Sequence, residues 1–142
     1  MKVERKCKIV EKTRMGDAVY MVLETGDMVR TSFKGPGQFV HIKCGDAQLL
    51  RRPISVCDYD EGSITIIYKV LGRGTKYMTT LAVGEKLDVL TGLGNGYDLT
   101  LAGSRPVLLG GGVGVPPMYK LAKELIAQGK EVTMIMGFNK AD

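Results

Sequence analysis

The sequence predicts a small closed barrel of six antiparallel β-strands followed by part of an α/β domain. Up to about residue 99, six short segments alternate apolar with polar residues and are separated by turn-forming residues. From residue 100 the pattern changes to a strand, an amphipathic helix and a second strand. The stretch at residues 91–106 is rich in glycine and small polar residues, which is typical of a connection. We therefore predict two domains, at residues 1–99 and 100–142.

The six predicted strands lie at residues 6–13, 18–25, 35–45, 52–58, 63–70 and 86–92. Strands of this length with period-two alternation bury one face, and six of them favour a small antiparallel barrel. Between the last two, "GRGTKYMTTLAVGE" (72–85) predicts a short helix that Thr75 caps, directly after a Gly-Arg-Gly turn.

The second domain begins with "PVLLGGG" (106–112), an apolar strand that ends in glycines. The next segment, "VPPMYKLAKELIAQG" (115–129), has apolar residues at helical spacing, prolines in its first turn and Gly129 at its end. A second apolar strand follows in "EVTMIMGF" (131–138). The pattern predicts one strand-helix-strand unit of a parallel sheet.

The composition indicates a globular protein of the cytoplasm. Of 142 residues, 44% are hydrophobic and 25% charged, and no apolar run is long enough to cross a membrane. The N-terminal segment alternates charged with apolar residues, unlike a signal peptide. Because Cys7, Cys44 and Cys57 are odd in number and widely spaced, we expect free thiols and no metal site. The net charge of +5 suits a phosphate-bearing partner.

Three motifs have residues that can bind an anion. The segments "LLGGGVGVPPM" (108–118) and "GRGT" (72–75) each place a glycine turn at a helix start, where backbone N–H groups attract negative charge. Arg51 and Arg52 precede Pro53 at a strand start, and an arginine there can bind a diphosphate through two hydrogen bonds. Alone, the first motif is as often structural as functional and lacks the third glycine of the G-x-G-x-x-G motif, and each of the other two is more often structural. Their combination favours a nucleotide ligand.

The motifs also carry a resemblance to a known group of proteins. The segments "PGQFV", "RRPIS", "IYKVLGRGTKYM", "LGNGY" and "GGGVGVPPM" occur in the order and at the spacings of the ferredoxin-reductase-like flavoproteins. Within that superfamily, the whole chain resembles the electron-transfer subunits of NAD-dependent bacterial dihydroorotate dehydrogenases. The segment "RRPISVCDYD" together with "GGGVGVPPM" is far more specific than either alone.

The resemblance implies a set of cofactor-binding residues and no catalytic acid, base or metal ligand, because the cofactor carries the chemistry. Arg52 would pair with the FAD diphosphate, which Gly74 and Thr75 would hold at the helix start. The flavin pocket would be lined by Pro53, Ile54, Ser55, Ile67, Tyr68 and Lys69, and the NAD phosphate turn would comprise Gly110, Gly111, Gly112, Gly114 and Pro116. The superfamily usually has an aromatic residue in place of Ile54, so the flavin must stack mainly elsewhere.

The resemblance further implies an oxidoreductase subunit of pyrimidine biosynthesis. Electrons would pass from an FMN-containing, dihydroorotate-oxidising subunit of a heterotetramer, through a [2Fe–2S] cluster, to FAD and then to NAD⁺. The family's four cluster cysteines have no counterpart here, and the nucleotide domain is expected to be cut after its second strand. We therefore expect a fragment with little activity and no NAD(H) affinity, whose residues 105–142 pack against a second copy or are poorly ordered.

Two alternatives remain open. The chain could belong to another NAD(P)H-linked complex, such as a ferredoxin:NADP reductase or a sulfide dehydrogenase. A nucleic-acid-binding barrel without enzymatic activity is disfavoured by the absence of tryptophan and the presence of only nine aromatic residues. His41 is expected to be an ordinary strand residue. The basic N-terminal strand is expected to be a solvated edge or to face an acidic partner; its cations are Lys2, Arg5, Lys6, Lys8, Lys12 and Arg14.

Overall fold

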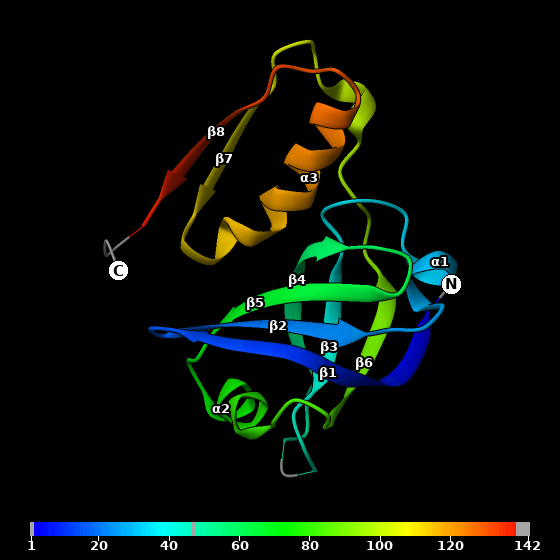
Figure 1. Cartoon of the computed structure of the whole chain (residues 1–142), viewed down its shortest axis with the longest axis vertical. Helices are drawn as coiled ribbons and strands as arrows, with labels where there is room; N and C mark the ends of the chain where they lie inside the picture. Colours follow the sequence, from blue (N-terminus) through cyan, green and yellow to red (C-terminus); the bar gives the residue numbers. More distant parts are fainter. Residues whose placement is uncertain (1, 47, 139–142) are drawn as a thin grey trace.

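The six predicted strands form a closed barrel in the computed structural model, which describes residues 2–46 and 48–138 (Figure 1). The strands are β1 (Val3–Met15), β2 (Ala18–Glu24), β3 (Phe39–Lys43), β4 (Arg52–Tyr59), β5 (Ser63–Lys69) and β6 (Lys86–Leu93). They close in the order β1-β2-β5-β4-β3-β6, and every neighbouring pair is antiparallel. The predicted fold class is confirmed.

Alternation along the strands fills the barrel with side chains. On β5, Ile64, Ile66 and Tyr68 are at most 2% exposed, whereas the residues between them are half-buried. The facing strand β2 buries Val19, Met21 and Leu23 in the same way. Each buried aliphatic side chain contributes about 1.5–3 kcal/mol of transfer free energy, so the interior of the barrel is the main source of its stability.

A β-bulge in β1 changes which side chains face the interior. The register with β2 shifts between Ile9 and Glu11, which leaves Val10 as the extra residue. Beyond the bulge, Lys12 pairs with the fully buried Met21, so its side chain lies on the inner face. Simple alternation from Ile9 would have turned Lys12 outward. The expectation that the whole basic strand is a solvated edge is therefore wrong at Lys12.

Helix α2 (Arg73–Thr80) closes one end of the barrel and inserts the fully buried Met78 into the core. The helix begins two residues before Thr75, so the prediction that Thr75 is its N-cap is wrong. Gly72 is the N-cap, and the Thr75 hydroxyl, three residues later, accepts hydrogen bonds from the N–H groups of Leu71 and Gly72. A second short helix, α1 (Met28–Ser32), was not predicted by the sequence pattern and buries Met28 beside the barrel.

The chain leaves the barrel through a loop that packs back on the segment before β3. Gly37 has φ +95°, and a Cβ there would lie 2.5 Å from the ring of Tyr97. The N–H of Tyr97 donates to the carbonyl of Pro36 at 2.8 Å. The side chain of the buried Gln38 donates to the carbonyl of Leu93 at the end of β6. These contacts fix the direction in which the connection leaves the barrel.

The remaining chain forms the predicted strand-helix-strand unit. Strands β7 (Val107–Gly111) and β8 (Thr133–Gly137) are parallel, and between them lie the turn η2 (Gly112–Gly114) and helix α3 (Pro116–Ala127). Gly129, with φ +81°, follows the helix as expected. The predicted domain boundary at residues 99 and 100 falls within the turn η1 (Leu99–Leu101) and stays a prediction.

One face of the β7–β8 pair packs against α3, and the other is open. Leu108 is buried with Leu121 and Leu125 of α3. Val107, Leu109 and Ile135, on the opposite face, are each more than half exposed. Both strands are formed in the described part of this segment. The expectation that residues 105–142 pack against a second copy or are poorly ordered stays a prediction.

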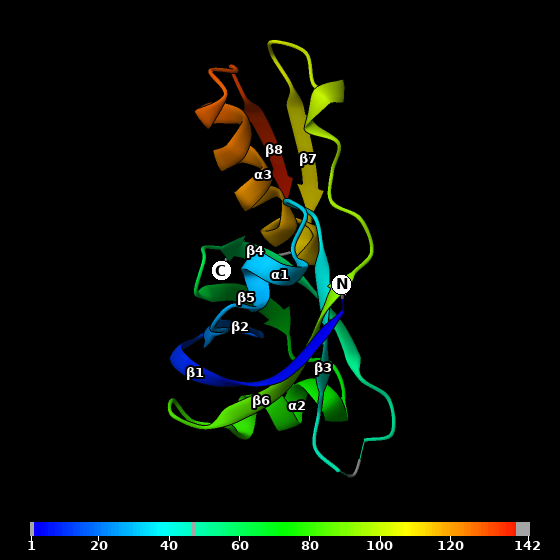
Figure 2. The ribbon, with the colours of Figure 1, turned by 90° about the vertical axis from the view of Figure 1, so that its right-hand side faces the viewer.

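Helix α3 rests on strand β4 of the barrel, as Figure 2 shows. The Asp58 carboxylate accepts a hydrogen bond from Lys123 at 2.9 Å and lies 3.7 Å from the Lys120 ammonium. Lys120 also lies over the ring of Tyr59, 4.7 Å from its centre. These contacts hold the glycine turn before α3 on one side of the barrel. No helix within the described ranges is long and apolar enough to span a membrane.

We predict that Gly37→Ala lowers the free energy of unfolding by about 2 kcal/mol or more, because a Cβ adds left-handed backbone strain and overlaps Tyr97. Gly35→Ala is the matched control, since a Cβ there meets nothing within 4 Å. Urea unfolding of both variants measures the difference. Equal stability of the two variants would show that the connection does not pack on this segment as described.

Candidate functional site

A cavity of about 370 Å³ lies where β4, β5, the start of α2 and the turn after β7 meet. Its wall includes all nine barrel residues that the sequence predicted for the cofactor pocket: Arg52, Pro53, Ile54, Ser55, Ile67, Tyr68, Lys69, Gly74 and Thr75. Four lining residues were missed: Leu71, Gly72, Arg73 and Val113. Three of them lie within or beside the predicted "GRGT" turn, so the motif itself was the signal that could have found them.

The two adjacent arginines, Arg51 and Arg52, have different roles. Arg51 donates to the Asp88 carboxylate at 2.8 Å and to the main-chain carbonyls of His41 and Asp88, so it ties the start of β4 to β3 and β6. Its guanidinium also lies 3.3 Å from the Glu4 carboxylate. Arg52 makes none of these contacts and lines the cavity instead. Only the second arginine is therefore placed to meet a ligand.

The side chain of Arg52 lies directly on helix α2. A Cβ at Gly74 would be 2.7 Å from the Arg52 Nε and 2.9 Å from its Cγ, so only glycine leaves room for the arginine there. The guanidinium donates to the carbonyl of Leu50 at 2.6 Å and to the side-chain oxygen of Gln48 at 2.9 Å. These two bonds orient the guanidinium and leave further N–H groups for a ligand.

The first turn of α2 provides backbone donors at the same place. Among the described residues, the N–H groups of Arg73, Gly74 and Thr75 have no acceptor, because the first main-chain bond of the helix runs from Lys76 to Gly72. The Thr75 hydroxyl is occupied by the two N–H groups before the helix. Any bond from Thr75 to a ligand in this arrangement would therefore come from its main chain. Unpaired N–H groups at a helix start attract an anion.

The charges on the cavity wall have one sign. Arg52, Lys69 and Arg73 are cations, and the lining contains no carboxylate among the residues that the structure describes. Lys69 lies 3.5 Å from the carboxylate of Asp17, which offsets part of its charge. The rest of the wall is mainly apolar and includes Pro53, Ile54, Ile67, Leu71 and Val113. The cavity thus combines cationic side chains and a helix start with an apolar wall, an arrangement that suits a phosphate-bearing aromatic ligand.

The glycine turn after β7 lies next to this cavity. Val113 of η2 lines the cavity, whereas the predicted residues Gly110, Gly111, Gly112, Gly114 and Pro116 do not. A Cβ at Gly110 would be 3.1 Å from the Gly114 carbonyl oxygen and from the Val115 Cα. A larger residue would therefore crowd the main chain of the turn, which is a structural reason for glycine at this position. Because Pro116 and Pro117 have no N–H, donors for an anion at this turn must come from the glycine segment itself.

The three cysteines are separate buried thiols. Cys57 is the extra residue of a bulge in β4, where the register with β5 shifts between Val56 and Asp58. Burial raises the pKa of its thiol to about 11, the Asp58 charge adds to the rise, and the Lys123 charge opposes it. No cluster of three or more metal-ligating side chains occurs within residues 2–46 and 48–138. These residues do not fit an iron–sulfur cluster, which needs four ligands.

The barrel, the cavity at the start of α2 and the adjoining glycine turn define a protein of the ferredoxin-reductase-like fold class. The NADH-dependent reduced ferredoxin-NADP oxidoreductase has the same fold, with a TM-score of 0.83 and 27% identity over 96% of this chain and 49% of that one. Phthalate dioxygenase reductase superimposes with a TM-score of 0.74 at 18% identity, covering 95% of this chain and 43% of its own. No family model matches the sequence.

By sequence, the chain is similar to the electron transfer subunits of dihydroorotate dehydrogenase B (NAD(+)). It is 42% identical to the subunit of Listeria monocytogenes serotype 4a over 98% of this chain and 56% of the relative. Its identity to the Fusobacterium nucleatum subunit is also 42%, over 100% of this chain and 56% of the relative. The chain thus spans about half the length of the curated relatives it matches.

The separate roles of the two arginines predict different effects on stability. Arg51→Met should lower the free energy of unfolding by about 1–3 kcal/mol, because it leaves the half-buried Asp88 carboxylate without its partner. Arg52→Met should change it by less than about 1 kcal/mol, since its bonds are to an exposed loop. Denaturant unfolding without ligand measures both. The opposite order would contradict these assignments.

The buried thiols predict slow labelling of the native protein. With a pKa of about 11, only about one Cys57 thiol in a thousand is ionised at pH 8, against about a quarter for an unperturbed cysteine. Ellman's reagent should therefore react far more slowly in buffer than in denaturant. If Cys57 labelled equally fast in both, the packing of α3 over β4 would be wrong.

Proposed function

We propose that the cavity binds FAD, with the diphosphate between Arg52 and the first turn of α2. The observation that carries this proposal is the contact of the Arg52 side chain with Gly74, next to three unpaired N–H groups. An arginine and a helix start that converge on one point offer charge-assisted hydrogen bonds to both phosphates. Arg73 adds a third source of positive charge at the same end of the cavity.

The isoalloxazine would lie along the apolar wall of β4 and β5. Pro53, Ile54 and Ile67 offer a surface for a flat ring, and the exposed Ser55 lies beside them. Tyr68 is only 2% exposed and its hydroxyl lies 3.3 Å from that of Thr79, so it belongs to the barrel core and is not free to stack. Contact with the ring would therefore be mainly aliphatic and would include Ile54, although the sequence predicted stacking mainly elsewhere.

The nicotinamide nucleotide would reach the flavin from the glycine turn. Val113 brings the turn η2 to the wall of the cavity, and the ion pairs of Asp58 with α3 hold the turn there. Gly110, Gly111, Gly112, Gly114 and Pro116 would approach the phosphates of NAD(H). Bound FAD would supply two-electron exchange with NAD(H) and one-electron exchange with a redox partner. The chain's own residues would bind and orient both ligands, and none would act as acid or base.

The sequence relatives support a specific biological role for this electron transfer. By analogy with their names, we infer that the protein serves a dihydroorotate dehydrogenase, in which an FMN-containing catalytic subunit supplies electrons for the reduction of NAD⁺ in pyrimidine biosynthesis. A [2Fe–2S] cluster would have to be held by residues other than the three separate cysteines described above.

A flavin subunit of another NAD(P)H-linked reductase is the second candidate. The likeness to the NADH-dependent reduced ferredoxin-NADP oxidoreductase favours it, because that fold match extends over 96% of this chain at 27% identity. The identities of 42% to the dihydroorotate dehydrogenase subunits are higher and favour the first candidate. A pull-down that recovers a dihydroorotate-oxidising partner would distinguish the two.

We predict that Arg52→Ala weakens FAD binding by roughly one to two orders of magnitude, since each charge-assisted hydrogen bond is worth about 1.5–3 kcal/mol. Quenching of flavin fluorescence during titration measures the affinity. Arg30→Ala is the control, because this exposed arginine lies on α1, outside the cavity. If Arg52→Ala bound FAD as tightly as the parent, the diphosphate site would be misplaced, and if the parent did not bind FAD, the proposed function would fail.

A further inference from the structure

Lys12 occupies an unusual position for a lysine on the N-terminal strand. Its ammonium donates to the main-chain carbonyls of Thr79 and Leu81, the latter at 2.7 Å, at the C-terminal end of α2. The side chain is half-buried, whereas Lys2, Lys6 and Lys8 are exposed. No carboxylate pairs with Lys12 among the described residues. The charge of Lys12 is therefore directed at the end of a helix.

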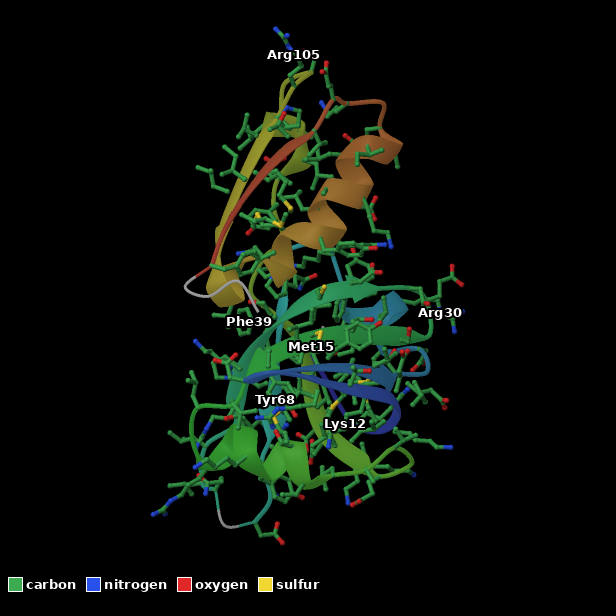
Figure 3. All side chains as sticks on the ribbon, turned by 60° about the vertical axis from the view of Figure 1, so that its left-hand side comes forward. Lys12, Met15, Arg30, Phe39, Tyr68 and Arg105 are labelled. Atoms are coloured by element: carbon green, nitrogen blue, oxygen red, sulfur yellow. The ribbon has the colours of Figure 1, made fainter. Side chains whose placement is uncertain are left out.

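The bulge at Val10 is what brings Lys12 to this helix. Because the bulge shifts the alternation of β1, Lys12 lies on the inner face opposite Met21, at the end of the barrel that α2 closes. A cation at a helix C-terminus is stabilised by the helix dipole and satisfies carbonyls that have no partner within the helix. Figure 3 shows Lys12 and Tyr68 in the part of the barrel near α2. The sequence pattern alone gives no sign of this contact.

The same helix joins Lys12 to the cavity. Its C-terminal end is held by Lys12, by the contact between the hydroxyls of Tyr68 and Thr79, and by Met78, which is buried in the core. Its N-terminal end carries Gly74 against Arg52 at the cavity wall. The helix has only eight residues, so a displacement at one end moves the other. Lys12 thus lies at the opposite end of α2 from the three unpaired N–H groups.

We propose that Lys12 is a positioning residue for the cofactor diphosphate and acts through helix α2 without touching the ligand. This proposal rests on the proposed function. Lys12 fixes the depth of α2 in the mouth of the barrel, and that depth sets the distance between the first-turn N–H groups and the Arg52 guanidinium. Removing the ammonium should therefore weaken the binding of ligands that carry a diphosphate and spare a flavin that lacks one.

The experiment compares FAD with riboflavin, which has the same ring system but no diphosphate. Lys12→Met keeps the length of the side chain and removes its charge and donors. We expect the dissociation constant for FAD to rise roughly three- to tenfold and that for riboflavin to change by less than about twofold. Lys8→Met is the matched control from the exposed face of the same strand and should leave both affinities unchanged. Lys12→Arg should restore most of the FAD affinity.

The outcomes separate this proposal from the proposed function. If the parent did not bind FAD, both would fail. If the parent binds FAD and Lys12→Met loses affinity for FAD and riboflavin equally, or for neither, the positioning role is overturned and the FAD site stands. Should Lys12→Met not fold, Lys12→Gln replaces it, since its amide keeps two N–H donors but carries no charge. An unchanged ratio of FAD to riboflavin affinity in that variant would also overturn the proposal.

Discussion

The packing of Arg52 against Gly74 is the contact on which the candidate site depends. It brings the start of β4 and the start of α2 together, although 21 residues of sequence separate them. Gly74 is needed because a Cβ would overlap the arginine, and Arg51 is needed because its bonds to Asp88 and His41 fix the strand that presents Arg52. One arginine therefore builds the frame and the other faces the cavity. In the "RRP" segment, the structural arginine, Arg51, therefore directly precedes the arginine that lines the cavity, Arg52.

The cavity at this contact lies between the two parts of the chain, the barrel and the strand-helix-strand unit. The cavity extends from α2, past β4 and β5, to Val113 in the turn after β7. That turn is held in place by α3, whose Lys120 and Lys123 meet Asp58 on β4. A ligand bound along this surface would have its anionic part at the helix start and its flat part toward the glycine turn. Hydride transfer between a nicotinamide and a flavin would need this approach, because the two reacting rings must come into contact.

Much of the fold followed from the sequence, because alternation and turn residues are local signals and predicted the six strands. The nine lining residues that the structure brings together were implied by the resemblance to the ferredoxin-reductase-like flavoproteins and not by a local pattern. The inward turn of Lys12 was missed, since a bulge breaks alternation without a clear sequence mark. The start of α2 was misplaced because a threonine was taken as the cap, whereas Thr75 bonds back to Gly72 from within the first turn. The cavity-facing Val113 depends on how α3 packs on β4, and no local pattern encodes that packing.

The central claim is that the first turn of α2 and Arg52 together hold a diphosphate, and a crystal structure of the protein grown with FAD tests it most directly. The account predicts phosphate oxygens within hydrogen-bonding distance of the Arg52 guanidinium and of the N–H groups of Gly74 and Thr75, with the flavin ring against Pro53 and Ile54. A diphosphate bound at the glycine turn of residues 110–114, with the start of α2 left free, would contradict it.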